Sequence, residues 1–277
     1  MLAVILGLLV GLTLGLTGAG GSIIAVPLLM LALGWSLPQA APVALLAVAA
    51  SAAFGTWVAW DKTYVRYRAA LVMGGVGALM TPLGQQLASV LPARVLVLMF
   101  AGVMLVVATR LLLQTLLDPA AAVVLRAAVA GDGARAGGPV CRLDSATGRI
   151  LWTPRCAAVL GGIGATAGVL AGLLGVGGGF VIVPSLRAST ELSMHSAVAT
   201  SLMTIALTAG GAVVASAIHN PALPWRVALP FVGGALAGMV LARKAAPKIA
   251  GLRLQQGFAL FTGVVALGWG ARAAGLV

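Results

Sequence analysis

The chain has 277 residues, of which 61% are hydrophobic and only 8% are charged. A soluble domain of this size could not bury so much apolar surface, so the composition excludes one and predicts an all-α polytopic membrane protein in a lipid bilayer. The formal net charge of +12 comes from 17 Lys and Arg residues against five acids. In a membrane protein such an excess marks cytoplasmic loops, so it gives little support to a nucleic-acid partner.

Two glycine clusters divide the chain into similar halves. The first is GAGGSIIAVP at 18–27, and the pattern returns as GVGGGFVIVP at 175–184, which is a constant offset of 157 residues. The offset also relates three upstream glycines of each half, which are Gly7, Gly11 and Gly15 in the first and Gly164, Gly168 and Gly172 in the second. The chain is therefore a duplication, with a membrane repeat at 1–113, a linker at 114–155 and a second membrane repeat at 156–277.

Each glycine cluster interrupts a strongly apolar segment. Glycine is costly inside a helix and adopts positive φ easily, so we expect each cluster to break its helix. In hydrocarbon, a broken helix is tolerated only where it lines a cavity or is buried in protein, and paired breaks in two halves are typical of a transporter's binding site. The GxxxG spacing of Gly7, Gly11 and Gly15 instead favours close helix packing.

The broken segments leave two topologies open. Residues 2–17 and 23–34 would form helices of about 24 and 18 Å, together too long for one straight crossing and too short for two. Straight crossings would give eight spans and parallel repeats, whereas re-entrant hairpins would leave three full crossings per half and make the repeats inverted. The hairpins gather 14 of the 17 basic residues on one side and straight crossings only 11. The positive-inside rule therefore favours hairpins.

The linker at 114–155 is expected to be cytoplasmic and to carry no chemistry. Its segment 140–153 has two short strand-like runs around a turn and predicts a small β-hairpin. The spacing of Cys141 and Cys156 matches no metal motif, and a cytoplasmic loop would keep both as reduced thiols.

Few side chains offer reactive chemistry. The acids, which fall in loops or at helix ends, are Asp61, Asp118, Asp132, Asp144 and Glu191. A carboxylate proton relay or cation site inside the membrane is therefore not expected. The sequence contains no Ser-His-Asp order, metal cluster or phosphate loop, so it predicts neither an enzyme nor a cofactor. Gln85 and Gln86, which fall opposite Arg243 and Lys244 at an offset of 158 residues, are expected to be helix-end groups that snorkel.

The breaks themselves suit an anion. Half-helices that start near Ser22 and Gly179 would direct their N-termini, with positive dipole ends, at the break. A polar stretch follows the second break, and its Thr200 and Ser201 are the hydroxyls most expected to face substrate, the others bonding their own helix. Because the first half has Val43 and Ala44 there, we expect the second break to matter more. The predicted substrate-binding residues are Gly18, Gly20, Gly21, Ser22, Gly175, Gly177, Gly178, Gly179, Thr200 and Ser201.

In its ordered motifs the chain resembles the TauE/SafE family of sulfite exporters and anion permeases. The resemblance rests on GAGGSIIAVPLL, GVGGGFVIVPSL and the segment HSAVATSL at 195–202, and it extends over nearly the whole chain. It implies export or exchange of sulfite, sulfonates or related oxyanions across the bacterial inner membrane. The first half departs from the pattern with Ala-Pro-Val-Ala at 41–44. A passive anion channel and a non-transporting membrane scaffold are the alternatives.

Overall fold

The computed structural model describes residues 1–18, 21–59, 65–117, 140–141, 150–190, 192, 194–219, 224–245, 260 and 263–268. Most of these residues are helical, and the rest form short connections, turns and isolated bridge residues, with no strand among them. The helices are α1 Leu2–Thr17, α2 Gly21–Leu33, α3 Leu37–Ala59, α4 Tyr67–Val90, α5 Ala93–Leu117, α7 Pro154–Leu174, α8 Gly179–Ser189, α9 Met194–His219 and α10 Trp225–Ala245. The all-helical prediction is confirmed for the described residues, and the predicted β-hairpin falls largely outside them.

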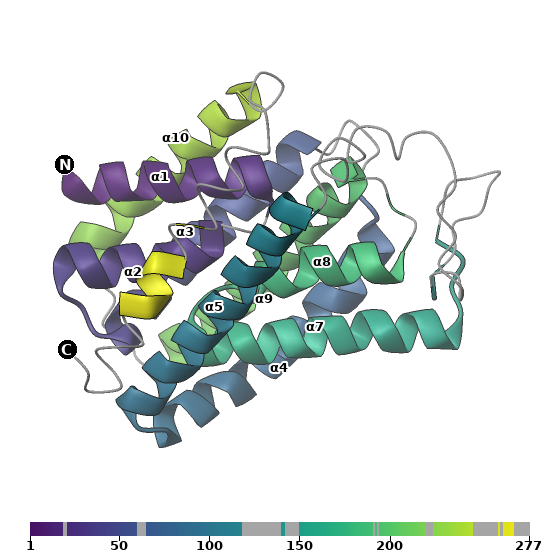
Figure 1. Cartoon of the computed structure of the whole chain (residues 1–277), viewed down its shortest axis with the longest axis horizontal. Helices are drawn as coiled ribbons and strands as arrows, with labels where there is room; N and C mark the ends of the chain where they lie inside the picture. The colour runs from purple at the N-terminus through teal and green to yellow at the C-terminus, as the bar shows by residue number, and fades with distance from the viewer. Residues whose placement is uncertain are drawn as a thin grey trace.

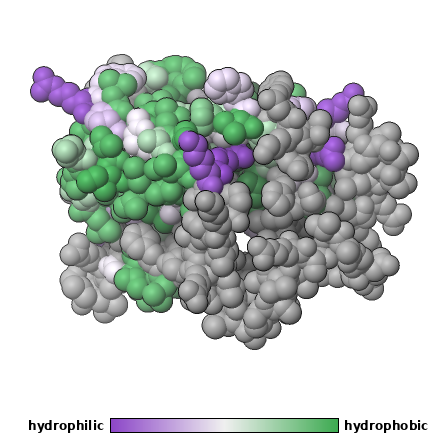
Figure 2. All heavy atoms as spheres, turned by 90° about the horizontal axis from the view of Figure 1, so that it is seen from above, coloured by the Kyte–Doolittle hydropathy of each residue, from purple (hydrophilic) through white to green (hydrophobic). Residues whose placement is uncertain are grey.

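Several helices are suited to a bilayer. Four described segments are long and apolar enough to span one, namely Leu37–Ala59, Pro154–Leu174, Ser196–Ile218 and Trp225–Lys244. Shorter apolar helices occupy Leu2–Thr17, Gly21–Leu33 and Ala93–Thr109. Much of the described surface in Figure 2 is hydrophobic, as expected for side chains that face lipid. The apolar run at 254–271 lies mostly outside the described residues.

The helices of the two halves are interleaved. α1 packs most extensively on α10, and its counterpart α7 packs most extensively on α4, while α3 and α9 lie against each other between these pairs (Figure 1). The first helix of each half therefore has its main partner in the other half. The two pairings are equivalent, because α1 matches α7 and α4 matches α10 in the repeat.

Glycines permit this close pairing. A Cβ on Gly11 would overlap the backbone carbonyl of Ala235, and a Cβ on Gly168 would overlap the carbonyl of Gly77. Gly7 and Gly164 have the same relation to Phe231 and to Met73. The helix backbones are thus in direct contact, which confirms the prediction that the GxxxG glycines serve helix packing.

The buried polar side chains of the described residues carry hydroxyl groups. Every fully buried polar residue in the described part of the chain is a serine or a threonine. All five acids lie outside the described residues. Among the described residues, the groups available deep between these helices are therefore backbone amides and hydroxyls.

Candidate functional site

The first glycine cluster ends α1 and begins α2. Gly18 caps α1 in the left-handed region at φ 74°, and its N–H donates to the carbonyl of Leu14 at 2.8 Å. After Gly18 the chain turns back, because a Cβ on Gly21 would lie 2.5 Å from both the Leu14 Cβ and the Val10 carbonyl oxygen. The start of α2 thus lies beside the middle of α1. Gly20, one of the predicted site residues, falls outside the described residues.

The second cluster repeats this geometry between α7 and α8. Gly175 caps α7 at φ 71°, and Gly177 and Gly178 also have positive φ, at 70° and 67°. Side chains rarely adopt this region, so these positions favour glycine. A Cβ on Gly178 would lie 2.5 Å from the carbonyl oxygen of Ala167, which places the start of α8, at Gly179, beside the middle of α7.

The two breaks meet inside the protein. A Cβ on Gly177 would lie 3.6 Å from the Cβ of Ser22 and 3.2 Å from Val48 Cγ1. The Thr208 hydroxyl lies 3.5 Å from the Gly177 carbonyl oxygen. Ser51, which matches Thr208 in the repeat, is fully buried, and its hydroxyl has no hydrogen-bond partner within the described residues. Small residues and hydroxyl groups therefore surround the point where α2 and α8 begin.

Each break packs on the long central helix of the other half. Gly18 lies against Val198 of α9, and Gly175 lies against Ala41 of α3, which is the equivalent position. We expected Thr200 and Ser201 beside the second break, but α9 places them close to the contact with the first. The expectation assumed that each half packs on itself, whereas Val198 of the same helix contacts Gly18 of the other half.

Most hydroxyls of α9 are used within the protein. Thr200 accepts a hydrogen bond from the backbone N–H of Arg66 at 3.1 Å, and Ser201 donates to the carbonyl of Val198 at 2.8 Å. Thr204 donates to the carbonyl of Thr200 at 3.0 Å. These bonds leave further lone pairs on each hydroxyl and leave the Thr200 proton able to donate. The role of Thr200 and Ser201 in binding a substrate stays a prediction.

A pair of equivalent polar contacts joins α4 to α9 and α10 to α3. Gln85 Nε2 donates to the carbonyl of Ala212 at 2.9 Å and to the hydroxyl of Ser216 at 2.8 Å. Its counterpart Arg243 donates from Nη2 to the carbonyl of Gly55 at 2.6 Å. Both side chains thus bind a neighbouring helix, where the sequence predicted that they snorkel. The acceptors Gly55 and Ala212 are 157 residues apart and the donors 158, so the repeat was the signal that could have identified this pair.

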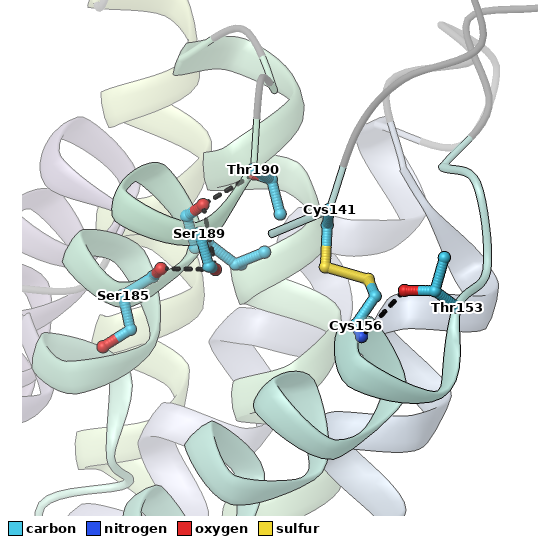
Figure 3. The surroundings of a disulfide bond; sticks show 7 residues. Cys141, Thr153, Cys156, Ser185, Ser189 and Thr190 are labelled. Atoms are coloured by element: carbon cyan, nitrogen blue, oxygen red, sulfur yellow. Dashed lines mark hydrogen bonds between the residues drawn. A yellow bond between two sulfur atoms is a disulfide. The ribbon is translucent and has the colours of Figure 1, made fainter. Parts of the chain in front are cut away.

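The two cysteines form a disulfide with 5.2 Å between their Cα atoms (Figure 3). The N–H of Cys141 donates to the carbonyl of Ser189 at 3.0 Å, and Cys141 forms an isolated parallel bridge with Thr190. At the other cysteine of the disulfide, the backbone N–H of Cys156 donates to the Thr153 hydroxyl, which caps α7. The disulfide therefore ties the start of α7 to the end of α8.

The expectation of reduced thiols was therefore wrong. It followed from placing 114–155 in the cytoplasm on the basis of charge alone. Spacing in the sequence could not reveal that α8 brings Cys141 back to α7. Disulfides persist mainly in oxidising compartments, so this bond and the excess of basic residues favour opposite sides of a membrane.

Comparison with known proteins identifies the family of this chain. The sequence model of the family described as "Sulfite exporter TauE/SafE" matches residues 3–268. The chain belongs to the TauE/SafE family. Two relatives from Xylella fastidiosa, each named "Probable membrane transporter protein", align over 235 residues, 84% of this chain and 79% of theirs. The protein of strain 9a5c is 30% identical and that of strain Temecula1 29% identical. No solved structure matches this TauE/SafE protein. Its family and relatives indicate a membrane transporter.

Proposed function

We propose that the protein is a secondary transporter that moves small sulfur-containing oxyanions, such as sulfite or an organosulfonate, across the bacterial inner membrane. The observation that carries this proposal is the meeting of the two glycine breaks at Gly177 and Ser22. Two helices, α2 and α8, begin at this point. The family description names sulfite, which favours an oxyanion as the substrate.

The chemistry of the meeting point supports an anion. The first N–H groups of a helix have no partner within the helix, and the helix dipole makes that end electropositive. Two such helix starts can bind an oxyanion without a buried cation. Thr208 and Ser51 add hydroxyls beside them, and the Ser51 hydroxyl has no other described partner. Thr200 would add a donor along the path from the first break, and Ser201 would add one when its proton leaves the Val198 carbonyl.

The proposed topology is an inverted repeat with two re-entrant hairpins. The contacts of Gly21 with α1 and of Gly178 with α7 support hairpins over straight crossings. The exchange of partners between α1 and α7 fits a pseudo-two-fold axis in the membrane plane. Rocking of one half against the other around the breaks would then give alternating access.

Transport is tested in lipid vesicles that contain the purified protein. We expect saturable counterflow when vesicles loaded with unlabelled sulfite are placed in labelled sulfite. An anion that binds the same site should reduce the uptake of labelled sulfite. Sulfate, thiosulfate and taurine form the competitor panel. Unsaturable flux without counterflow would indicate a channel instead. Absence of any protein-dependent flux for the whole panel would contradict the proposal.

Gly177→Ala is the sharpest probe of the meeting point. Gly178→Ala is less suitable, because its Cβ would meet the Ala167 backbone, whereas the nearest atom to a Cβ on Gly177 is a side-chain methyl at 3.2 Å. The new methyl would point toward Ser22 and hinder approach of the anion to the amides. Loss of one charge-assisted hydrogen bond corresponds to at least about tenfold weaker binding, measured by titration of the purified protein with sulfite.

Gly34→Ala is the matched control. Gly34 also has positive φ, at 66°, but nothing lies within 4 Å of its Cβ position. Both substitutions therefore carry the same kind of backbone strain, about 1–2 kcal/mol. Thermal unfolding should report this shared loss, and only Gly177→Ala should weaken binding. Equal affinities in the two variants would remove the meeting point from the binding site.

A further inference from the structure

Two guanidinium groups have unused donors at one end of the molecule. Arg243, at the end of α10, and Arg66, just before α4, are both half-buried. The Nε atom of each is buried, and neither Nε has a hydrogen-bond partner within the described residues. Buried donors in native proteins are normally satisfied, so two orphaned ones call for an explanation.

Contacts bring both arginines to the first glycine break. Ala242, the neighbour of Arg243, packs on the last turn of α1, because a Cβ on Gly15 would lie 2.5 Å from the Ala242 Cβ. Arg243 itself binds Gly55 near the end of α3. Arg66 is held through its backbone N–H by Thr200, near the start of α9. This end of the protein therefore contains the ends of α1, α3 and α10 and the start of α9.

The repeat shows that the charge of Arg243 is not needed for packing. Gln85 makes the equivalent contact in the other half. Its side-chain amide donates to the Ala212 carbonyl and to the Ser216 hydroxyl. A neutral amide is thus sufficient to bind the neighbouring helix. Arg243 makes the same contact with one nitrogen and has further donors in the fixed fork of its guanidinium. Its charge and spare donors are available to a ligand.

We propose that Arg243 and Arg66 form an entry site for oxyanions at this end of the protein, and we call it the arginine vestibule. A guanidinium matches two terminal oxygens of one sulfur or phosphorus centre, which is the geometry of sulfite, sulfonate and phosphate groups. The vestibule captures the free anion beside the first break, from which Thr200 and the breaks receive it. Gln85 at the equivalent end lacks the charge, so the two entrances differ in anion affinity. The inference rests on the proposed function for its substrate class.

The test is equilibrium titration of the purified full-length protein in uncharged detergent with sulfite under nitrogen. Arg243→Gln introduces the residue type that binds the matching carbonyl of Ala212 in the other half, so we expect it to keep the contact with Gly55 and to fold. We expect this variant to bind sulfite about ten- to a hundredfold more weakly, the loss of one charge-assisted interaction. Arg243→Lys keeps the charge without the fork and should be intermediate. Arg66→Gln should weaken binding in the same direction.

Arg226→Gln is the matched control, because Arg226 is an exposed arginine at the opposite end of α10. Its affinity should equal that of the wild type. Equal affinity in Arg243→Gln, or a loss confined to its thermal stability, would overturn the proposal. Binding of phosphatidylglycerol with no binding of sulfite by the wild type would also overturn it, since a lipid headgroup would then be the ligand. If vesicles show no flux but binding still depends on Arg243, the transport function fails and the vestibule stands.

Discussion

Gly168→Val is expected to destabilise the protein by at least about 3 kcal/mol, the upper end of overpacking costs. At this position the backbone of α7 touches that of α4, and a Cβ would lie 2.7 Å from the Gly77 Cα and carbonyl carbon while overlapping the carbonyl oxygen. No side-chain rotation relieves a clash with backbone, so the two helices must separate. Thermal unfolding in detergent, together with the yield of monodisperse protein, measures the loss.

The same helix provides the control. Gly162 is exposed, and nothing lies within 4 Å of its Cβ position. Gly162→Val should therefore leave stability within about 1 kcal/mol of the wild type, with a gain possible because glycine is a poor helix former. Gly11→Val, the counterpart of Gly168→Val in the first half, should be as damaging. Similar stability of Gly168→Val and Gly162→Val would refute direct backbone contact between α7 and α4.

Cys156→Ser is expected to lower the free energy of unfolding by about 3 kcal/mol, the cost estimated for losing a cross-link that closes a loop of 15 residues. The disulfide joins the base of the α7–α8 hairpin, whose tip carries the second glycine break. Its loss should therefore loosen the hairpin as well as the linker. The measurement is thermal unfolding of the purified protein with and without reductant.

The reductant supplies an internal control for this prediction. Reduction should shift the wild type to the stability of Cys156→Ser and leave the variant unchanged. A maleimide should label the two wild-type thiols only after reduction. Labelling of untreated wild-type protein, or a melting transition insensitive to reductant, would show that the cross-link is absent. In intact cells, a membrane-impermeant reductant should reduce the disulfide only if the linker lies on the outer side of the membrane. The same experiment therefore also reports the side on which the linker lies.

The sequence was most informative where backbone conformation depends on glycine. Gly18 and Gly175 were predicted to end helices, and both do so with positive φ at equivalent positions. The small-residue spacing of Gly7 to Gly15 also predicted close packing correctly. These features follow from local chemistry, because the missing Cβ determines both the allowed φ and the distance of approach.

Features that depend on which helices are neighbours could not be predicted in this way. The 157-residue offset identified equivalent helices but not their exchange of partners, so the contact of α9 with the first break was not foreseen. The disulfide was missed for the same reason, since the contact of Cys141 with Ser189 depends on α8 returning to the base of α7. The contact of Gln85 with α9 was also not predicted. A polar residue at a helix end is compatible both with snorkelling and with a hydrogen bond to a neighbouring helix, so the sequence did not distinguish them.

The interleaved pairing imposes an order on synthesis. α7 begins at Pro154, when its partner α4, which ends at Val90, has already left the ribosome. α1 instead waits for α10, which begins at Trp225, about 200 residues after α1 ends. At about 5–20 residues per second, that delay is roughly 10–40 seconds. Although the two contacts are equivalent in the finished protein, the glycine face of α1 must contact lipid or a chaperone during this interval. The first helix to be synthesised is therefore among the last to pack on its main partner.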